Sequence, residues 1–173
     1  MIGQPLDRVR GMSADLTRLL LTLHIIGACA WLGANLAQVA LSSSVVKASP
    51  EVRVWWSGAG ERLGKVLYPA AGMVVLITGL VLVIGSENPG GVSFKSTFVS
   101  IGFAAVIVGV ALGITVFGPK NRALAAAIQS GDSEAESKLR STLAGFGLLD
   151  TAVVVVTIFV MVWKVGAKVK GID

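Results

Sequence analysis

The sequence predicts an all-α protein, a transmembrane four-helix bundle with up-down topology. Of its 173 residues, 54% are hydrophobic and only 14% are charged, and the mean hydropathy is +0.78. Soluble domains carry about 25% charged residues. Four apolar runs exceed the roughly 20 helical residues that cross a bilayer, and continuous runs of this length exclude barrel strands. We therefore expect a single domain over residues 1–173, with spans at about 17–42, 64–86, 94–118 and 143–164.

The first run contains the only histidine of the chain, His24. Helical spacing places His24, Trp31, Asn35 and Gln38 at i, i+7, i+11 and i+14, which is one stripe of the helix. Because polar side chains are costly against lipid, this stripe is expected to face the bundle interior. The run is too long for the apolar part of a signal peptide, so it is interpreted as a retained span.

The connection after the first run begins a new helix at Ser49-Pro50-Glu51. This pattern combines a capping hydroxyl, a proline in the first turn and a carboxylate near the positive helix end. Trp55 and Trp56 follow within residues 50–62 and suit a membrane interface. After the second run, proline and paired glycines predict a tight turn over residues 86–91.

The third run carries Ala105, Gly109 and Gly113, a stripe of small residues that predicts close helix packing. An alanine-rich stretch, 120–130, is expected to extend this helix beyond the membrane, until Gly131-Asp132 ends it. The segment 133–142 then leads back, with Glu134/Lys138 and Glu136/Arg140 spaced for ion pairs at i, i+4.

The fourth run contains Asp150, the only acidic residue within a span. Its depth predicts a polar cluster with residues of the other three spans, and a buried carboxylate needs a partner. We expect that partner to be Tyr68 or a nearby cation. The predicted members of the cluster are Asn35, Gln38, Tyr68, Thr115 and Asp150, and the candidate cations are Lys65, Lys120 and Arg122.

Three functional hypotheses remain open beside a plain packing role for His24. In the first, the bundle binds haem b or copper in a redox role. His24 and Met161, which depth matching places at one level, are then the candidate metal ligands, with Trp31 and Asn35 lining the cofactor site. In the second, the protein is a non-catalytic subunit or assembly factor of a larger membrane complex. In the third, it carries protons or small ions by way of His24, Asn35 and Asp150.

The stretch Leu23–Gly33, LHIIGACAWLG, resembles the H-x-x-G-x-x-x-W-x-G opening of a bacterial group of four-helix membrane proteins. That group comprises copper-resistance D-like domains, DUF2269-type proteins and, more distantly, HemJ-type protoporphyrinogen oxidases. The resemblance implies an up-down bundle with the histidine inside, linked to haem in the HemJ-type members. This chain has Ala34-Asn35-Leu36-Ala37 where those members have leucine-proline-arginine, and it has no lysine midway through the third span. Both departures speak against porphyrinogen oxidation, and the DUF2269-type group fits best.

The charge pattern suits a membrane protein, and the resemblance implies the bacterial cytoplasmic membrane. The net charge of +5 suits basic ends beside anionic lipid, and its spread over every connection excludes a nucleic-acid site. Lysines and arginines are nearly balanced between the two sides. The basic leader of the first helix favours the N-terminus inside, whereas the short, nearly uncharged loop at 87–93 favours the N-terminus outside, which we expect. No HExxH, CxxC, P-loop or GxSxG motif occurs, so soluble-type hydrolysis and phosphoryl transfer have no candidate residues. Membrane lipid and either a second copy or a larger membrane complex are the expected partners.

Overall fold

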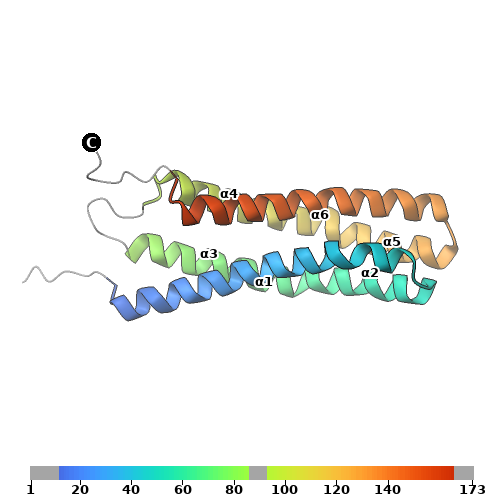
Figure 1. Ribbon diagram of the computed structural model, residues 1–173, viewed down its shortest axis with the longest axis horizontal. Helices are drawn as coiled ribbons and strands as arrows, with labels where there is room; N and C mark the ends of the chain where they lie inside the picture. The colour runs from blue at the N-terminus through green and yellow to red at the C-terminus, as the bar shows by residue number, and fades with distance from the viewer. Residues whose placement is uncertain (1–11, 86–92, 166–173) are drawn as a thin grey trace, which may run out of the picture.

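A computed structural model of the protein describes residues 12–85 and 93–165, and these confirm the all-α four-helix bundle. Four long rods lie side by side, and successive rods run in opposite directions (Figure 1). The predicted turn at 86–91 lies outside the described residues. We call the end of the bundle that holds Ala14 and Val162 the proximal end, and the opposite end the distal end. The rods are α1 (Ala14–Val46), α2 (Pro50–Lys65) with α3 (Leu67–Gly85), α4 (Thr97–Leu112) with the π-helix η1 (Gly113–Phe117) and α5 (Gly118–Ser130), and α6 (Ser133–Val162).

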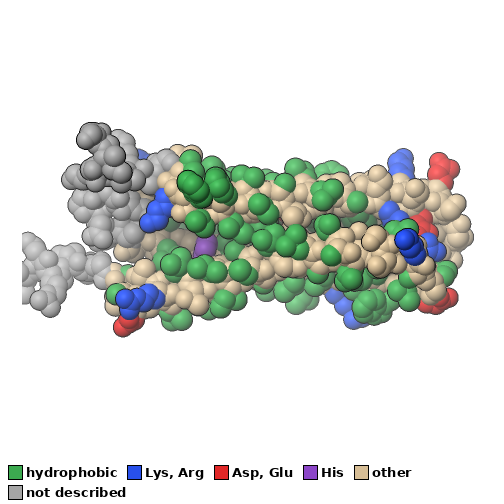
Figure 2. Space-filling model, viewed as in Figure 1, with side chains coloured by type: hydrophobic (Ala, Val, Ile, Leu, Met, Phe, Trp, Pro, Cys, Tyr) green, Lys and Arg blue, Asp and Glu red, His purple; other side chains and the backbone are tan. Residues whose placement is uncertain are grey.

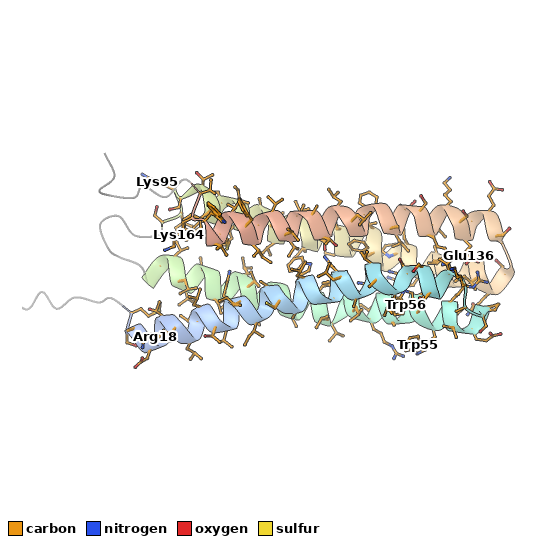
Figure 3. The ribbon with its side chains drawn as sticks, in the orientation of Figure 1. Arg18, Trp55, Trp56, Lys95, Glu136 and Lys164 are labelled. Atoms are coloured by element: carbon orange, nitrogen blue, oxygen red, sulfur yellow. The ribbon has the colours of Figure 1, made fainter. Side chains whose placement is uncertain are left out.

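The rods are longer than the membrane is thick. α1 has 33 residues and α6 has 30, which corresponds to about 45–50 Å at 1.5 Å per residue, against a hydrocarbon core of about 30 Å. Arg18, Lys95 and Lys164 lie at the proximal end (Figure 3). Counting about 20 residues inward from Arg18, Gly85 and Lys164 places the distal membrane boundary near Gln38, Val66 and Ala144.

By this count, we expect the distal part of the bundle to lie outside the hydrocarbon. It consists of α2, α5, the last turns of α1 and the first turns of α6, and charged side chains gather there in the space-filling view (Figure 2). Trp55, Trp56 and Glu136 lie in this part (Figure 3). α2 continues in line with α3 (Figure 1), and Trp55 lies about 15 Å beyond Lys65 along this rod. The interface position of Trp55 stays a prediction.

Prolines explain the interruptions of the second and third rods. A proline within a helix has no N–H to donate, and its ring crowds the carbonyl four residues earlier. Pro69 thus breaks the helix near Lys65, and Val66 separates α2 from α3. Pro119 acts on the carbonyl of Thr115, and the chain widens there into the π-turns of η1.

The connection between α5 and α6 follows the sequence prediction. Gly131 ends α5 in the left-handed conformation, at φ 73°, which favours glycine. The side chain of Asp132 accepts from the backbone N–H of Ala135 at 2.9 Å and caps α6. At the start of α2, Pro50 occupies the first turn as predicted, but Ser49 makes no side-chain cap. The capping prediction for Ser49 was wrong.

The packing holds the rods together unevenly. α1 packs chiefly on α3, α2 on α5, and α4 on α6. The main apolar core takes one residue from each of α1, α3, α4 and α6, namely Trp31, Ala71, Val106 and Val154, and a second core of Val83, Phe98, Val99 and Val160 lies in α3, α4 and α6. The candidate site is built around the first of these cores.

Candidate functional site

Asp150 is the centre of the polar site. Its side chain is buried, with a relative exposure of 4%. The carboxylate oxygen Oδ2 accepts two hydrogen bonds from α1, one from the indole Nε1 of Trp31 at 3.1 Å and one from Nδ2 of Asn35 at 2.7 Å. Two donors converge on one oxygen because Trp31 and Asn35 are four residues apart and share a face of α1. The inward stripe predicted for the first span is therefore the surface that holds Asp150.

The network continues from Asp150 toward the distal boundary. The hydroxyl of Tyr68 donates to Oδ1 of Asn35 at 2.7 Å, and Nε2 of Gln38 donates to the Tyr68 oxygen at 2.5 Å. The donors thus run in one direction, from Gln38 through Tyr68 and Asn35 to Asp150. We call these four residues, together with Trp31, the polar column. It brings α1, α3 and α6 together through polar contacts.

The second carboxylate oxygen of Asp150, Oδ1, is buried and has no hydrogen-bond partner among the described residues. No lysine or arginine of the described chain forms an ion pair with Asp150. Arg122, which the sequence placed in this cluster, instead bonds Glu61 at 2.9 Å, as does Lys65 at 2.7 Å. Tyr68 reaches Asp150 only through Asn35. Thr115 is exposed and bonds the carbonyl of Ala111, so it does not join the site.

Glycines of two other helices make room for the indole of Trp31. A Cβ on Gly109 of α4 would lie 2.2 Å from Cζ2 of the ring, and one on Gly72 of α3 would lie 3.5 Å from Cζ3. The indole, 6% exposed, is thus held between α4 and α3 while its Nε1 is bound to Asp150. Gly109 belongs to the predicted small-residue stripe, and this contact explains why it is small.

His24 lies two turns of α1 nearer the proximal end, against α3. Its Nδ1 is 3.0 Å from Oγ1 of Thr78. The Thr78 hydroxyl donates its single proton to the carbonyl of Val74 at 2.5 Å, so its oxygen accepts from Nδ1–H. This assignment leaves Nε2 as the ring nitrogen with the lone pair. The ring lies over Gly79, whose Cβ would be 3.2 Å from Cε1.

Met161 is directed toward α4. Its methyl carbon would be 2.1 Å from a Cβ on Gly102, so the thioether fills the space that this glycine leaves. Met161 also packs against the second apolar core. Met161 thus contacts Gly102 of α4, whereas His24 contacts Gly79 of α3, and their pairing as metal ligands stays a prediction. The described residues contain no group of three or more His, Cys, Asp or Glu side chains suited to a metal ion.

His24 and Asp150 lie near opposite ends of the expected hydrocarbon span. Asp150 is about six residues, or about 9 Å, from the distal boundary near Ala144, and His24 is about 9 Å from the proximal boundary near Arg18. About 12 Å of a core of about 30 Å remains between them. The indole of Trp31 and the main apolar core lie at this level. The predicted polar stripe is thus divided into two polar parts by a dry centre.

Sequence reasoning did not identify Trp31 as a partner of Asp150 or Thr78 as a partner of His24. A usable signal was present in both cases. A buried tryptophan N–H almost always finds an acceptor, and Asp150 is the only carboxylate within a span. A threonine beside a glycine on a span offers both a hydroxyl and space for a ring.

No protein-family model, no curated protein and no solved structure matches this chain.

Proposed function

We propose that this protein transfers protons in the membrane and that Asp150 is the group that takes them up from the distal face. The observation that carries the proposal is the unpaired oxygen Oδ1 of Asp150, buried at the inner end of the polar column. An unpaired carboxylate oxygen in a dry interior costs several kcal/mol. A proton on Oδ1 removes the buried negative charge, while Oδ2 keeps its hydrogen bonds to Trp31 and Asn35.

A proton suits this site better than a metal cation. Na⁺ or Ca²⁺ gives up its hydration shell only where several oxygen ligands replace the lost water, and calcium takes six to eight. Asp150 offers a single free oxygen, which is too few for a metal cation but enough for a proton. The amides of Gln38 and Asn35 hold the column in place. Asp150 exchanges protons with the distal face and His24 with the proximal face, and transfer between the two requires water to enter the apolar stretch of about 12 Å that separates them. We place the protein in the bacterial cytoplasmic membrane with its termini outside.

Proton flux into liposomes tests the proposal. Protein reconstituted with an enclosed pH dye, under a potassium diffusion potential, should acidify or alkalinise the lumen according to the sign of the potential. Asp150→Asn keeps an oxygen that accepts from Trp31 and Asn35 but cannot be protonated, and flux should fall at least about tenfold, the scale on which a lost proton carrier acts. Asp15→Asn removes an exposed carboxylate of α1 and should leave the flux unchanged. Full flux in a folded Asp150→Asn protein contradicts the proposal.

A second candidate function is the binding of haem or a metal by His24 in a redox role. The observation that favours it is the hydrogen bond from Nδ1 to Thr78. Ligating histidines usually donate their other ring N–H to an oxygen, which orients the ring and presents the second nitrogen to the metal. A Soret band or bound metal in the purified protein that His24→Ala removes would support this function. A colourless, metal-free preparation from cells supplied with haem precursors and copper would refute it.

The role of subunit in a larger membrane complex stays a prediction. The small-residue stripe that suggested it is divided between two surfaces. Gly109 receives Trp31 inside the bundle, while Ala105 lines a shallow apolar groove of about 370 Å³ between α4 and α6. The groove leaves Ala105 accessible to another helix, and no atom lies within 4 Å of a Cβ at Gly113.

A further inference from the structure

Glu61, Lys65 and Arg122 form a basic cluster that contains more positive charge than its carboxylate can balance. The ammonium Nζ of Lys65 and Nε of Arg122 both lie within 3 Å of the same oxygen, Oε1 of Glu61, at 2.7 and 2.9 Å. Two cations share one carboxylate, so the cluster has a net charge of +1. We call these three residues the boundary cluster, since they connect α2 and α5 at the point where the rods enter the membrane.

The position of the cluster along the rods matches the headgroup layer. Lys65 is the last residue of α2, and the apolar α3 begins at Leu67. Arg122 lies four residues beyond Gly118, where α5 begins after the apolar η1. The distal boundary derived above from helix lengths falls near Val66. The charged side chains are therefore expected at the depth of lipid phosphates, not in the hydrocarbon or far out in the water.

Both cations are open to ligands. The side chains of Lys65 and Arg122 are each 62% exposed, whereas that of Glu61 is 20% exposed. Arg122 contacts Glu61 through Nε, and a guanidinium has further N–H groups with which it can make paired hydrogen bonds to a phosphate. Ion pairs this exposed add little to stability, so a structural role does not explain why two cations are placed on one acid here.

A second cluster, with the same net charge but two arginines, differs from the boundary cluster in its exposure. Arg53 and Arg140 also share a single oxygen of their carboxylate partner, Glu136. Their side chains are only 22% and 20% exposed, and Nε of Arg53 is buried. This cluster is enclosed between α2 and α6 and fastens the distal part of the bundle. The boundary cluster has the same chemistry but faces outward.

We propose that the boundary cluster binds the phosphate group of an anionic phospholipid at the distal face. Arg122 holds two phosphate oxygens through its terminal nitrogens, and Lys65 supplies a second positive charge. Glu61 keeps the two cations parallel and prevents them from repelling one another. A free phosphate ion offers the same oxygens, so the two sources are separated by experiment. This inference does not depend on the proton-transfer proposal.

Native mass spectrometry of the detergent-purified protein tests the assignment with three separate additions, namely phosphatidylglycerol, phosphatidylcholine and inorganic phosphate. The wild type should bind phosphatidylglycerol at least tenfold more tightly than phosphatidylcholine. Lys65→Gln/Arg122→Gln should lose at least fivefold of that affinity, and Arg122→Lys should fall between, since it keeps the charge but not the fork. The matched control Lys47→Gln/Lys138→Gln removes two exposed charges elsewhere and should bind as the wild type does.

Three outcomes overturn the inference. Equal binding of the two lipids by the wild type removes the headgroup preference. Equal losses in the site and control variants show that net charge alone attracts the lipid. Binding of inorganic phosphate at the cluster, without any lipid preference, assigns the site to the free ion. Because neither cation is buried, the variants are expected to fold. Unchanged elution from a sizing column and an unchanged melting temperature would establish that they do.

Discussion

Replacing Gly109 with alanine should destabilise the protein by closing the space that holds Trp31. The new Cβ would lie 2.2 Å from Cζ2 and 2.4 Å from Cη2 of the indole. Ordinary contact begins at 3.4 Å, so the ring must move by at least 1.2 Å, the difference between the two distances. The indole is rigid, and α3 at Gly72 stands on its other side. A shift of this size breaks the 3.1 Å hydrogen bond to Asp150.

The cost follows from these two effects. Overpacking of a dense core costs about 1–3 kcal/mol, and a lost hydrogen bond to a charged group costs about 1.5–3 kcal/mol. The higher helix propensity of alanine offsets up to about 1 kcal/mol. We therefore expect a net loss of about 2–4 kcal/mol in the free energy of unfolding, measured by titration of detergent-solubilised protein with SDS.

Gly33→Ala provides the matched control, because no atom lies within 4 Å of a Cβ at Gly33. The same change in composition there should be neutral or stabilise by up to about 1 kcal/mol. Trp31→Phe combined with Gly109→Ala should recover part of the loss, since the smaller ring vacates the space. The reasoning is refuted if Gly109→Ala unfolds within about 0.5 kcal/mol of Gly33→Ala, the limit at which independent substitutions are distinguished.

Two further predictions concern the close crossing of α1 with α3 and the start of α2. Gly27→Ala would place its Cβ 2.9 Å from Cγ2 of Val75 and 3.2 Å from the backbone oxygen of Ala71. Because a backbone oxygen cannot move away as a side chain can, we expect the free energy of unfolding to fall by about 1–3 kcal/mol in the same SDS titration. Equal stability of Gly27→Ala and Gly33→Ala would contradict this. The hydrogen bond from the Ser49 hydroxyl lowers the pKa of Glu51 below its ordinary value of 4.5, so this contribution to stability is present above pH 4.5 and lost as the pH falls through the lowered pKa. Ser49→Ala should raise the pKa of Glu51 in an NMR titration and destabilise slightly at pH 7 but not at about pH 3; an unchanged pKa would show that the hydroxyl has no effect.

The architecture was predictable because membrane spans obey simple rules. Length and apolar composition located the four rods. The turn at Gly131-Asp132 was predictable because glycine suits a left-handed helix end and aspartate suits a helix start. The inward stripe of α1 was predictable for a similar reason. A polar side chain within a span is expected to face the bundle interior and not the lipid. The helical repeat of 3.6 residues then shows which polar side chains share a face.

The partners within the bundle were harder to predict because depth gives a residue's level but not its direction around the helix. Depth matching related Met161 to His24, yet the structure turns Met161 onto Gly102. It related Asp150 to cations at the boundary, yet Trp31 and Asn35 meet it from α1. These directions depend on which glycines lie opposite, and a single sequence does not show which helices are neighbours.

The third rod has buried residues on both sides of the π-helix η1. The inward residues Val99, Gly102 and Val106 precede it, and Leu124, Ala127 and Ile128 follow it, all buried. A π-turn contains one residue more than an α-helical turn, and one residue corresponds to about 100° of rotation. Loss of the exposed Ile114 would restore ordinary pitch and leave both halves facing the core, whereas loss of a residue within α4 would rotate every inward side chain beyond it toward lipid. The third rod can therefore change length by one residue at η1 while the bundle around Asp150 stays the same.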